Sequence, residues 1–119
     1  MAELFEVFGS LKSIMLPYTP QLACTSDTDR YFSLDTKYIE KNKKPLFFGA
    51  VQIKKNYVSY HLMPVYVNPK LLESVSPGLR KHMQGKSCFN FKSPDASLFK
   101  ELSTLTDAGF KDFKKRGYV

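Results

Sequence analysis

Hydrophobic residues recur at helical spacing at the start of the chain. One apolar stripe runs along its first four turns, formed by Leu4, Phe8, Leu11 and Met15. Pro17 and Pro20 follow directly and cannot continue such a helix. The pattern therefore predicts an amphipathic helix from residue 2 to residue 16, whose stripe packs on the core; a docking face is the less favoured alternative.

Strand-like alternation dominates the middle of the chain. Residues 45–66 are dense in Val, Ile, Tyr and Phe, and Lys55-Asn56 lies between two such runs, which indicates a hairpin. Counting outward from a two-residue turn pairs Ile53 with Val58, Val51 with Tyr60, and Gly49 with Leu62. We expect these residues and Phe47 to face the core. The opposite face, exposed to water or a ligand, would then carry Phe48, Ala50, Gln52, Lys54, Tyr57, Ser59, His61 and Met63.

Shorter elements surround this hairpin. Residues 21–25 and 31–35 alternate on either side of a turn-rich segment, which predicts a second hairpin. Residues 67–85 return to a helical pattern, with proline after Asn68 and Ser76 as at helix starts. A strand over residues 86–92 and a last helix over 93–115 complete the chain. Residues 1–119 are thus predicted to form one α+β domain, with helices on one face of a mainly antiparallel sheet.

Charge narrows the classes of partner. The 119 residues include 18 Lys and Arg against 11 Asp and Glu, a formal charge of +7. Such a chain attracts nucleic acid, anionic metabolites or acidic proteins, although solvated surface charge is the simpler explanation. The first residues are acidic and lack the features of a secretory signal, and no apolar run is long enough for a membrane span. We therefore expect a cytoplasmic protein with no membrane partner.

Few residues suggest chemistry. Cys24 and Cys88 have no partners at metal-site spacing, so we expect two free thiols and no cofactor. The sequence has no nucleophile elbow, zinc-protease motif or phosphate-binding glycine loop. Cys88 could act as a nucleophile if the sheet brought it beside His61, but packing is its simpler role. No catalytic residue is assigned; an enzyme stays open but is less favoured than a binding module.

Two groups of residues are candidates for binding an anionic ligand. The polar strand face offers an imidazole and a stacking wall, from Gln52, Tyr57, Ser59 and His61. Arg80 and Lys86, at the end of a predicted helix, could hold a phosphate or carboxylate. Solvated surface residues are the simpler alternative for both groups. We interpret Gln52, Tyr57, Ser59, His61 and Lys86 as one outer-face surface for an anionic small molecule or an acidic protein, with Arg80 beside Lys86 as a further candidate ligand-binding residue.

Nucleic acid is an alternative partner. Aromatic residues near the hairpin could stack on bases while Lys54 and Lys55 contact phosphates; these are Tyr31, Tyr57, Tyr60 and Phe48. Strand propensity and core filling explain the same aromatic residues. A nucleic-acid-binding accessory protein is therefore a second hypothesis.

Residues 47–63 and 85–91, with the helix after them, resemble the YdhG-like family of small bacterial domains of unknown function. The most specific passage is Met83-Gln84-Gly85-Lys86-Ser87-Cys88-Phe89-Asn90-Phe91, which is similar to the family's Gly-Lys-Gly motif, with Ser87 in place of the second glycine. The resemblance implies a frataxin-like two-layer sandwich, with both terminal helices on one face of an antiparallel sheet.

For some YdhG-like members the resemblance also implies iron delivery, with iron held on acidic side chains of the first helix and the adjoining strand. This chain offers few such side chains there, namely Glu3, Glu6, Asp27 and Asp29. A basic domain also disfavours a multivalent cation. A frataxin-like iron chaperone is therefore kept as a third hypothesis.

Overall fold

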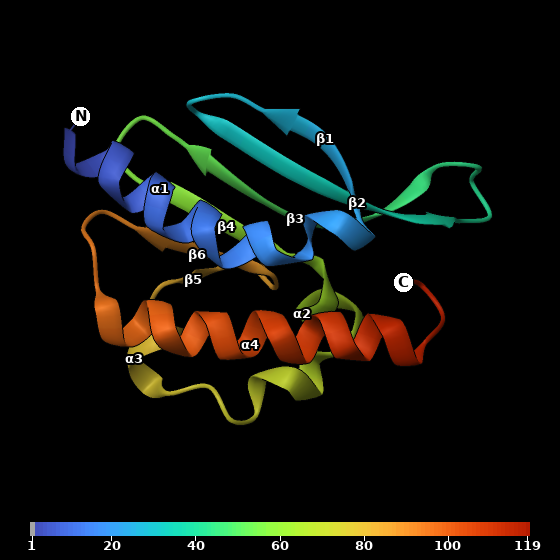
Figure 1. The fold of residues 1–119 in the computed structure, drawn as a ribbon. Coiled ribbons are helices and arrows are strands. Elements are labelled where there is room, and N and C mark those ends of the chain that lie inside the picture. The colour runs from blue at the N-terminus through green and yellow to red at the C-terminus, as the bar shows by residue number, and fades with distance from the viewer. Residues whose placement is uncertain (1) are drawn as a thin grey trace.

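A computed structural model describes residues 2–119, and residue 1 lies outside the described part of the chain (Figure 1). Its helical elements are α1 (Ala2–Met15), η1 (Leu16–Gln21), α2 (Met63–Val67), η2 (Pro69–Leu72), α3 (Pro77–Arg80) and α4 (Ala96–Lys115), where η marks a 3-10 helix. Its strands are β1 (Ala23–Asp27), β2 (Tyr31–Ile39), β3 (Pro45–Ile53), β4 (Val58–Leu62), β5 (Met83–Gln84) and β6 (Cys88–Phe91).

The six strands form one antiparallel sheet in the order β1-β2-β3-β4-β6-β5. The first and last helices, α1 and α4, contact each other and lie along the same side of the sheet (Figure 1). The short helices lie on that side too, so among residues 2–119 no helix covers the other side, which we call the open face. The predicted α+β class, with terminal helices on one face of an antiparallel sheet, is confirmed.

The two long helices dock through the apolar positions that the sequence indicates. In α1, Phe8, Leu11 and Met15 are buried, which confirms the predicted stripe as core. The buried face of α4 is formed by Phe99, Leu102, Leu105, Thr106, Gly109, Phe110 and Phe113. A side chain at Gly109 would place its Cβ 2.8 Å from the Cβ of Pro64, so glycine permits α4 to approach α2 closely.

The segment predicted as helix over residues 67–85 is only partly helical. Asn68 and Ser76 do cap helix starts, accepting hydrogen bonds from the N–H groups of Lys70 at 3.3 Å and Leu79 at 3.1 Å. Each cap begins only a short helical segment. Pro69 starts η2 and Pro77 starts α3, and each of these has four residues. Residues 83–84 then join the edge of the sheet as β5, and not the end of a helix.

The register of the β3–β4 hairpin is the predicted one: Gly49 pairs with Leu62, Val51 with Tyr60 and Ile53 with Val58. The predicted faces are wrong at the start of β3. Leu34 of β2 pairs with Gly49 while Asp35 pairs with Phe47, so Phe48 is an extra residue of β3. Such a β-bulge breaks the alternation of side chains.

The bulge exchanges the expected places of two rings. Phe48 is 0% exposed and meets the rings of Phe110 and Phe113, with centroids 6.0 Å apart in both cases. Phe47 is half-buried, and its ring lies 4.8 Å from that of His61, on the open face. Met63, also expected on the open face, begins α2 and packs against the core.

Candidate functional site

The open face is built from direct cross-strand partners. One row crosses four strands through Tyr31, Gln52, Ser59 and Asn90, and the next row is formed by Ser33, Ala50, His61 and Cys88. Partners in a sheet project from the same face, so both rows form one continuous surface. The face therefore holds three of the six predicted site residues side by side: Gln52, Ser59 and His61.

The sheet brings His61 and Cys88 together as direct partners, which was the condition for a nucleophilic cysteine. Burial lowers the pKa of His61. Burial also raises the pKa of the Cys88 thiol, against the opposing effects of a hydrogen bond with Ser59 and the charge of Lys54. Both groups thus favour their neutral forms, whereas a reactive cysteine needs a stabilised thiolate. The pair supports no nucleophilic role.

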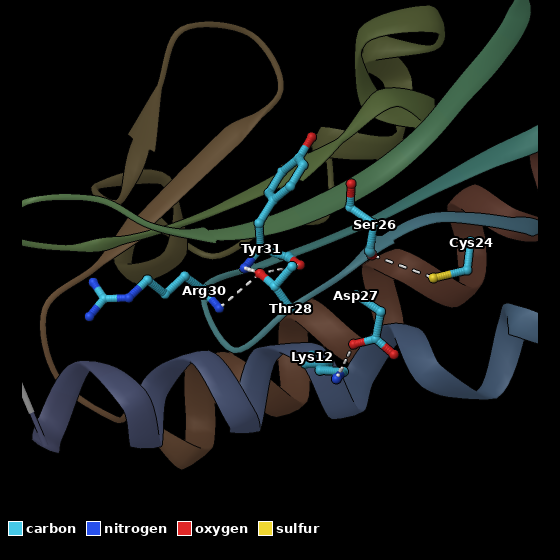
Figure 2. A network of polar contacts seen from close by, with 7 residues as sticks. All are labelled: Lys12, Cys24, Ser26, Asp27, Thr28, Arg30 and Tyr31. Carbon is cyan, nitrogen blue, oxygen red and sulfur yellow. Dashed lines mark hydrogen bonds and ion pairs between the residues drawn. The ribbon is translucent and has the colours of Figure 1, made fainter.

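The turn between β1 and β2 fixes the position of Tyr31. Thr28 Oγ1 accepts hydrogen bonds from the backbone N–H groups of Arg30 at 3.2 Å and Tyr31 at 3.0 Å, and the Thr28 N–H donates to the Tyr31 carbonyl at 2.8 Å. Lys12 of α1 holds the same turn through an ion pair with Asp27, 2.6 Å between Nζ and Oδ1. Figure 2 shows Asp27 reaching toward α1 while the Tyr31 ring extends away from it.

Tyr57, the fourth predicted residue of the face, lies at its edge. It lines a pocket of about 340 Å³ with His82, Asn90, Lys92 and Ser93. The His82 ring stacks on Phe91 with centroids 4.5 Å apart, and its Nδ1 lies 2.8 Å from the Asn90 carbonyl oxygen. Asn90 belongs to both this pocket and the first row, so Tyr57 is connected to the open face.

Arg80 and Lys86 come together, but not on the outer face, where Lys86 was expected. They line a cavity of about 430 Å³, the Arg80–Lys86 pocket, whose other lining residues are Val65, Tyr66, Pro69, Leu72, Met83 and Gly85. Met83 pairs with Phe89, a core residue that is 0% exposed, so the pocket lies at the sheet edge on the helical side. Arg80 and Lys86 therefore do not share one surface with Gln52, Ser59 and His61.

Neither cation of the Arg80–Lys86 pocket forms an ion pair with an acidic side chain of residues 2–119. The ion pairs found among residues 2–119 involve Lys12, Lys111 and Arg116, and neither Arg80 nor Lys86. Nη2 of Arg80 donates a hydrogen bond to the Leu72 carbonyl oxygen, which orients the guanidinium group. The pocket therefore combines two cations outside these ion pairs with largely apolar walls.

Several residues of these sites are absent from the predicted set. Asn90, His82 and Lys92 surround Tyr57, and Tyr66, Leu72 and Met83 form walls of the Arg80–Lys86 pocket. Alternation with Phe89 and Phe91 was a usable signal for Asn90, since it places that amide on the polar side of its strand. The other residues come from separate elements, whose contacts no local pattern indicates.

The nucleic-acid hypothesis loses two of its four rings. Tyr60 and Phe48 are both 0% exposed in the core, so neither can stack on a base. Tyr31 and Tyr57 keep half-buried rings at the open face. Phe47 and His61 add two rings that the hypothesis did not include.

The iron hypothesis finds no ligand cluster in the described part of the chain. No three His, Cys, Asp or Glu side chains among residues 2–119 come together as a metal site. Asp27, one of the four expected acidic residues, is held by Lys12. The arrangement of side chains therefore gives iron binding no support.

Comparisons of the chain with protein-family models, curated proteins and solved structures find no match. The YdhG-like resemblance accordingly stays a prediction. Within residues 2–119, every helix is too short or too polar to cross a bilayer.

Proposed function

We propose that the protein is a binding module for a small organic anion and that the Arg80–Lys86 pocket is its site. One observation carries the proposal: two cations that form no ion pair within residues 2–119 border a cavity whose other walls are largely apolar. An apolar body with one carboxylate or phosphate matches that combination. A neutral apolar molecule would leave the two cations without a partner, and a bare inorganic anion would leave the apolar walls without a contact.

The dimensions and the chemistry of the pocket agree with such a ligand. Its volume of about 430 Å³ falls within the range of small-molecule sites. Arg80 is already oriented by its bond to Leu72, and the remaining N–H groups of its fork can bind a carboxylate through two hydrogen bonds. Tyr66 is 55% exposed at the rim and supplies a wall against which a ring can pack.

The surrounding charge favours the same class of ligand. The chain carries a formal charge of +7, which raises the local concentration of anions around the molecule. Arg80 ends α3, and a helix C-terminus repels anions, but α3 has only four residues and its dipole is correspondingly weak. The two cationic side chains outweigh it.

A thermal-shift screen at low salt tests the proposal with aromatic and aliphatic carboxylates, each beside its neutral amide. A ligand present at about one hundred times its Kd adds about 2.7 kcal/mol to the unfolding free energy, which is easily detected. We expect acids to bind and their amides to fail. Arg80→Met and Lys86→Met should each weaken an acid about tenfold or more, because a hydrogen bond to a charged group contributes about 1.5–3 kcal/mol.

Lys81→Met is the matched control, since Lys81 follows Arg80 in the chain and does not line the pocket. It should leave the affinity unchanged. Equal binding of an acid and its amide, or equal losses in the Lys81 and Arg80 variants, would contradict the proposal.

We also propose a cytoplasmic location and membership of the YdhG-like family. Exposed Cys24 and half-buried Cys88 are free thiols, and a chain with two free thiols suits the reducing cytoplasm. The succession of a first helix, an antiparallel sheet and a last helix on the same side supports membership of the YdhG-like family and a frataxin-like sandwich.

A further inference from the structure

The open face carries an arrangement that is separate from the Arg80–Lys86 pocket. We propose that it binds single-stranded nucleic acid, with bases stacking on Tyr31 and Tyr57 and with phosphates held by Lys54 and Lys92. The proposal does not depend on the organic-anion site, because the two lie on opposite sides of the sheet.

The shape of the face suits flat ligands. Its middle is a low floor, because Ser33 and Ala50 are small and only 5% and 7% exposed, while larger side chains flank them. The row from Tyr31 to Asn90 crosses four strands, which gives it a width of about 14 Å from three spacings of about 4.8 Å. A four-stranded face of this kind has room for about two or three bases.

Two tyrosine rings stand beside that floor, toward the end of the sheet that holds the β3–β4 turn. The Thr28 turn holds the backbone of Tyr31, and in Figure 2 the ring of this residue extends from the side of the sheet opposite α1. Tyr57 stands across the sheet beside β6, where it lines the pocket with Asn90. A tyrosine ring turns about only two side-chain bonds, so it loses little freedom when a base stacks on it. Stacking on both tyrosines would place bases over the Gln52 and Asn90 amides, which offer donors and acceptors.

Positive charge gathers beside the rings. The Lys54 N–H donates to the Tyr57 carbonyl at 2.7 Å, so Lys54 adjoins this tyrosine, and Lys92 lines the same pocket. Asp35 pairs with Phe47 beyond the row of Ser33 and Ala50, so its carboxylate lies away from both lysines. The charge thus complements a phosphate backbone at the Tyr57 end, and the half-buried rings beside it favour unpaired bases over a duplex.

Fluorescence anisotropy with labelled oligothymidylate and oligouridylate of about 12 nucleotides tests the inference at about 50 mM salt. We expect saturable binding of a single strand and much weaker binding of a duplex of the same length. Tyr31→Ala and Tyr57→Ala should each raise Kd about tenfold, while Tyr31→Phe, which keeps the ring, should stay close to the parent protein. Tyr38→Ala removes an exposed ring that packs against Tyr118 at the other end of β2 and should leave the affinity for the oligonucleotide unchanged.

The salt dependence tests the lysines separately. Neutralising Lys54 and Lys92 to Gln should reduce the slope of log K against log salt by about 1.4, which is two phosphates at about 0.7 each. The matched control neutralises Lys100 and Lys115, which are exposed on α4, and should reduce it little. Absence of saturable binding, a duplex bound as tightly as a single strand, or equal effects of the two lysine pairs would overturn the inference. Circular dichroism and Tm of each variant would verify that it is folded.

Discussion

A buried hydrogen bond joins the centre of the sheet to α4. The loss of unfolding free energy on removing it should depend on which of the two partners is replaced. The Tyr60 hydroxyl oxygen lies 2.6 Å from Oγ1 of Thr106, and both residues are 0% exposed. Thr106 uses its one hydroxyl proton to donate to the Leu102 carbonyl at 2.8 Å. Tyr60 must therefore be the donor and Thr106 the acceptor. Burial also raises the pKa of Tyr60, which keeps this donor protonated.

The two single substitutions differ in what they leave behind. Tyr60→Phe removes the donor, and Thr106 still donates to Leu102, so the loss is that of one hydrogen bond, about 0.5–1.5 kcal/mol. Thr106→Val keeps the shape but leaves the phenolic hydroxyl buried without an acceptor, which costs about 1–3 kcal/mol. The double variant leaves no orphaned donor. Its cost should fall below the sum of the single costs by about 1 kcal/mol.

Equilibrium unfolding in urea, followed by circular dichroism, measures all four proteins of this cycle. Equal m-values across the set would show that the unfolded states are comparable. The reasoning is refuted if Thr106→Val costs less than Tyr60→Phe, or if the two costs are additive.

Three further results are expected. Gly49→Ala should destabilise the fold by about 1–3 kcal/mol in the same urea assay, because the new Cβ would lie 2.5 Å from Cε of Met15 and 2.9 Å from a backbone oxygen; an unchanged midpoint would contradict this. Cys88, in a variant whose other cysteine is serine, should be alkylated with a midpoint at higher pH in the folded than in the urea-unfolded protein, because burial raises its pKa; a midpoint at lower pH would be contrary. Burial and Asp107 raise the pKa of Tyr18 to about 12. The contribution of this shift to the unfolding free energy should therefore be fully present below about pH 10 and be lost as the pH rises toward 12. Tyr18→Phe should remove that part of the pH dependence, and an unchanged dependence would contradict this.

The sequence was informative wherever a local pattern decided the structure. The α1 stripe and the turn at Lys55-Asn56 depend on residues close together in the chain, and both gave the observed helix and register. The face predicted for Phe48 is wrong, because this residue is buried in the core. Counting from the turn assumes unbroken alternation, but the bulge arises from the pairing of β3 with β2, which the count did not include.

The candidate site was less predictable than the fold, because its parts come from distant elements. Alternation correctly placed Gln52, Ser59 and His61 on one face. Arg80 and Lys86 were recognised by charge alone, and their pocket depends on how α2 and η2 pack beside β5. The sequence predicts helix over residues 67–85 with starts at Asn68 and Ser76, whereas Met83 belongs to a strand and lines that cavity.

The proposed function is tested most directly by locating a bound organic anion in the folded protein. Amide shifts of the isotope-labelled protein, measured while an aromatic carboxylate from the screen is added, identify the residues that it contacts. We predict saturable shifts at Leu72, Met83, Gly85 and Lys86, and little change at Ser59 and Asn90 on the open face. Shifts centred on Ser59 and Asn90, with the Arg80–Lys86 pocket unchanged, would contradict the proposed site.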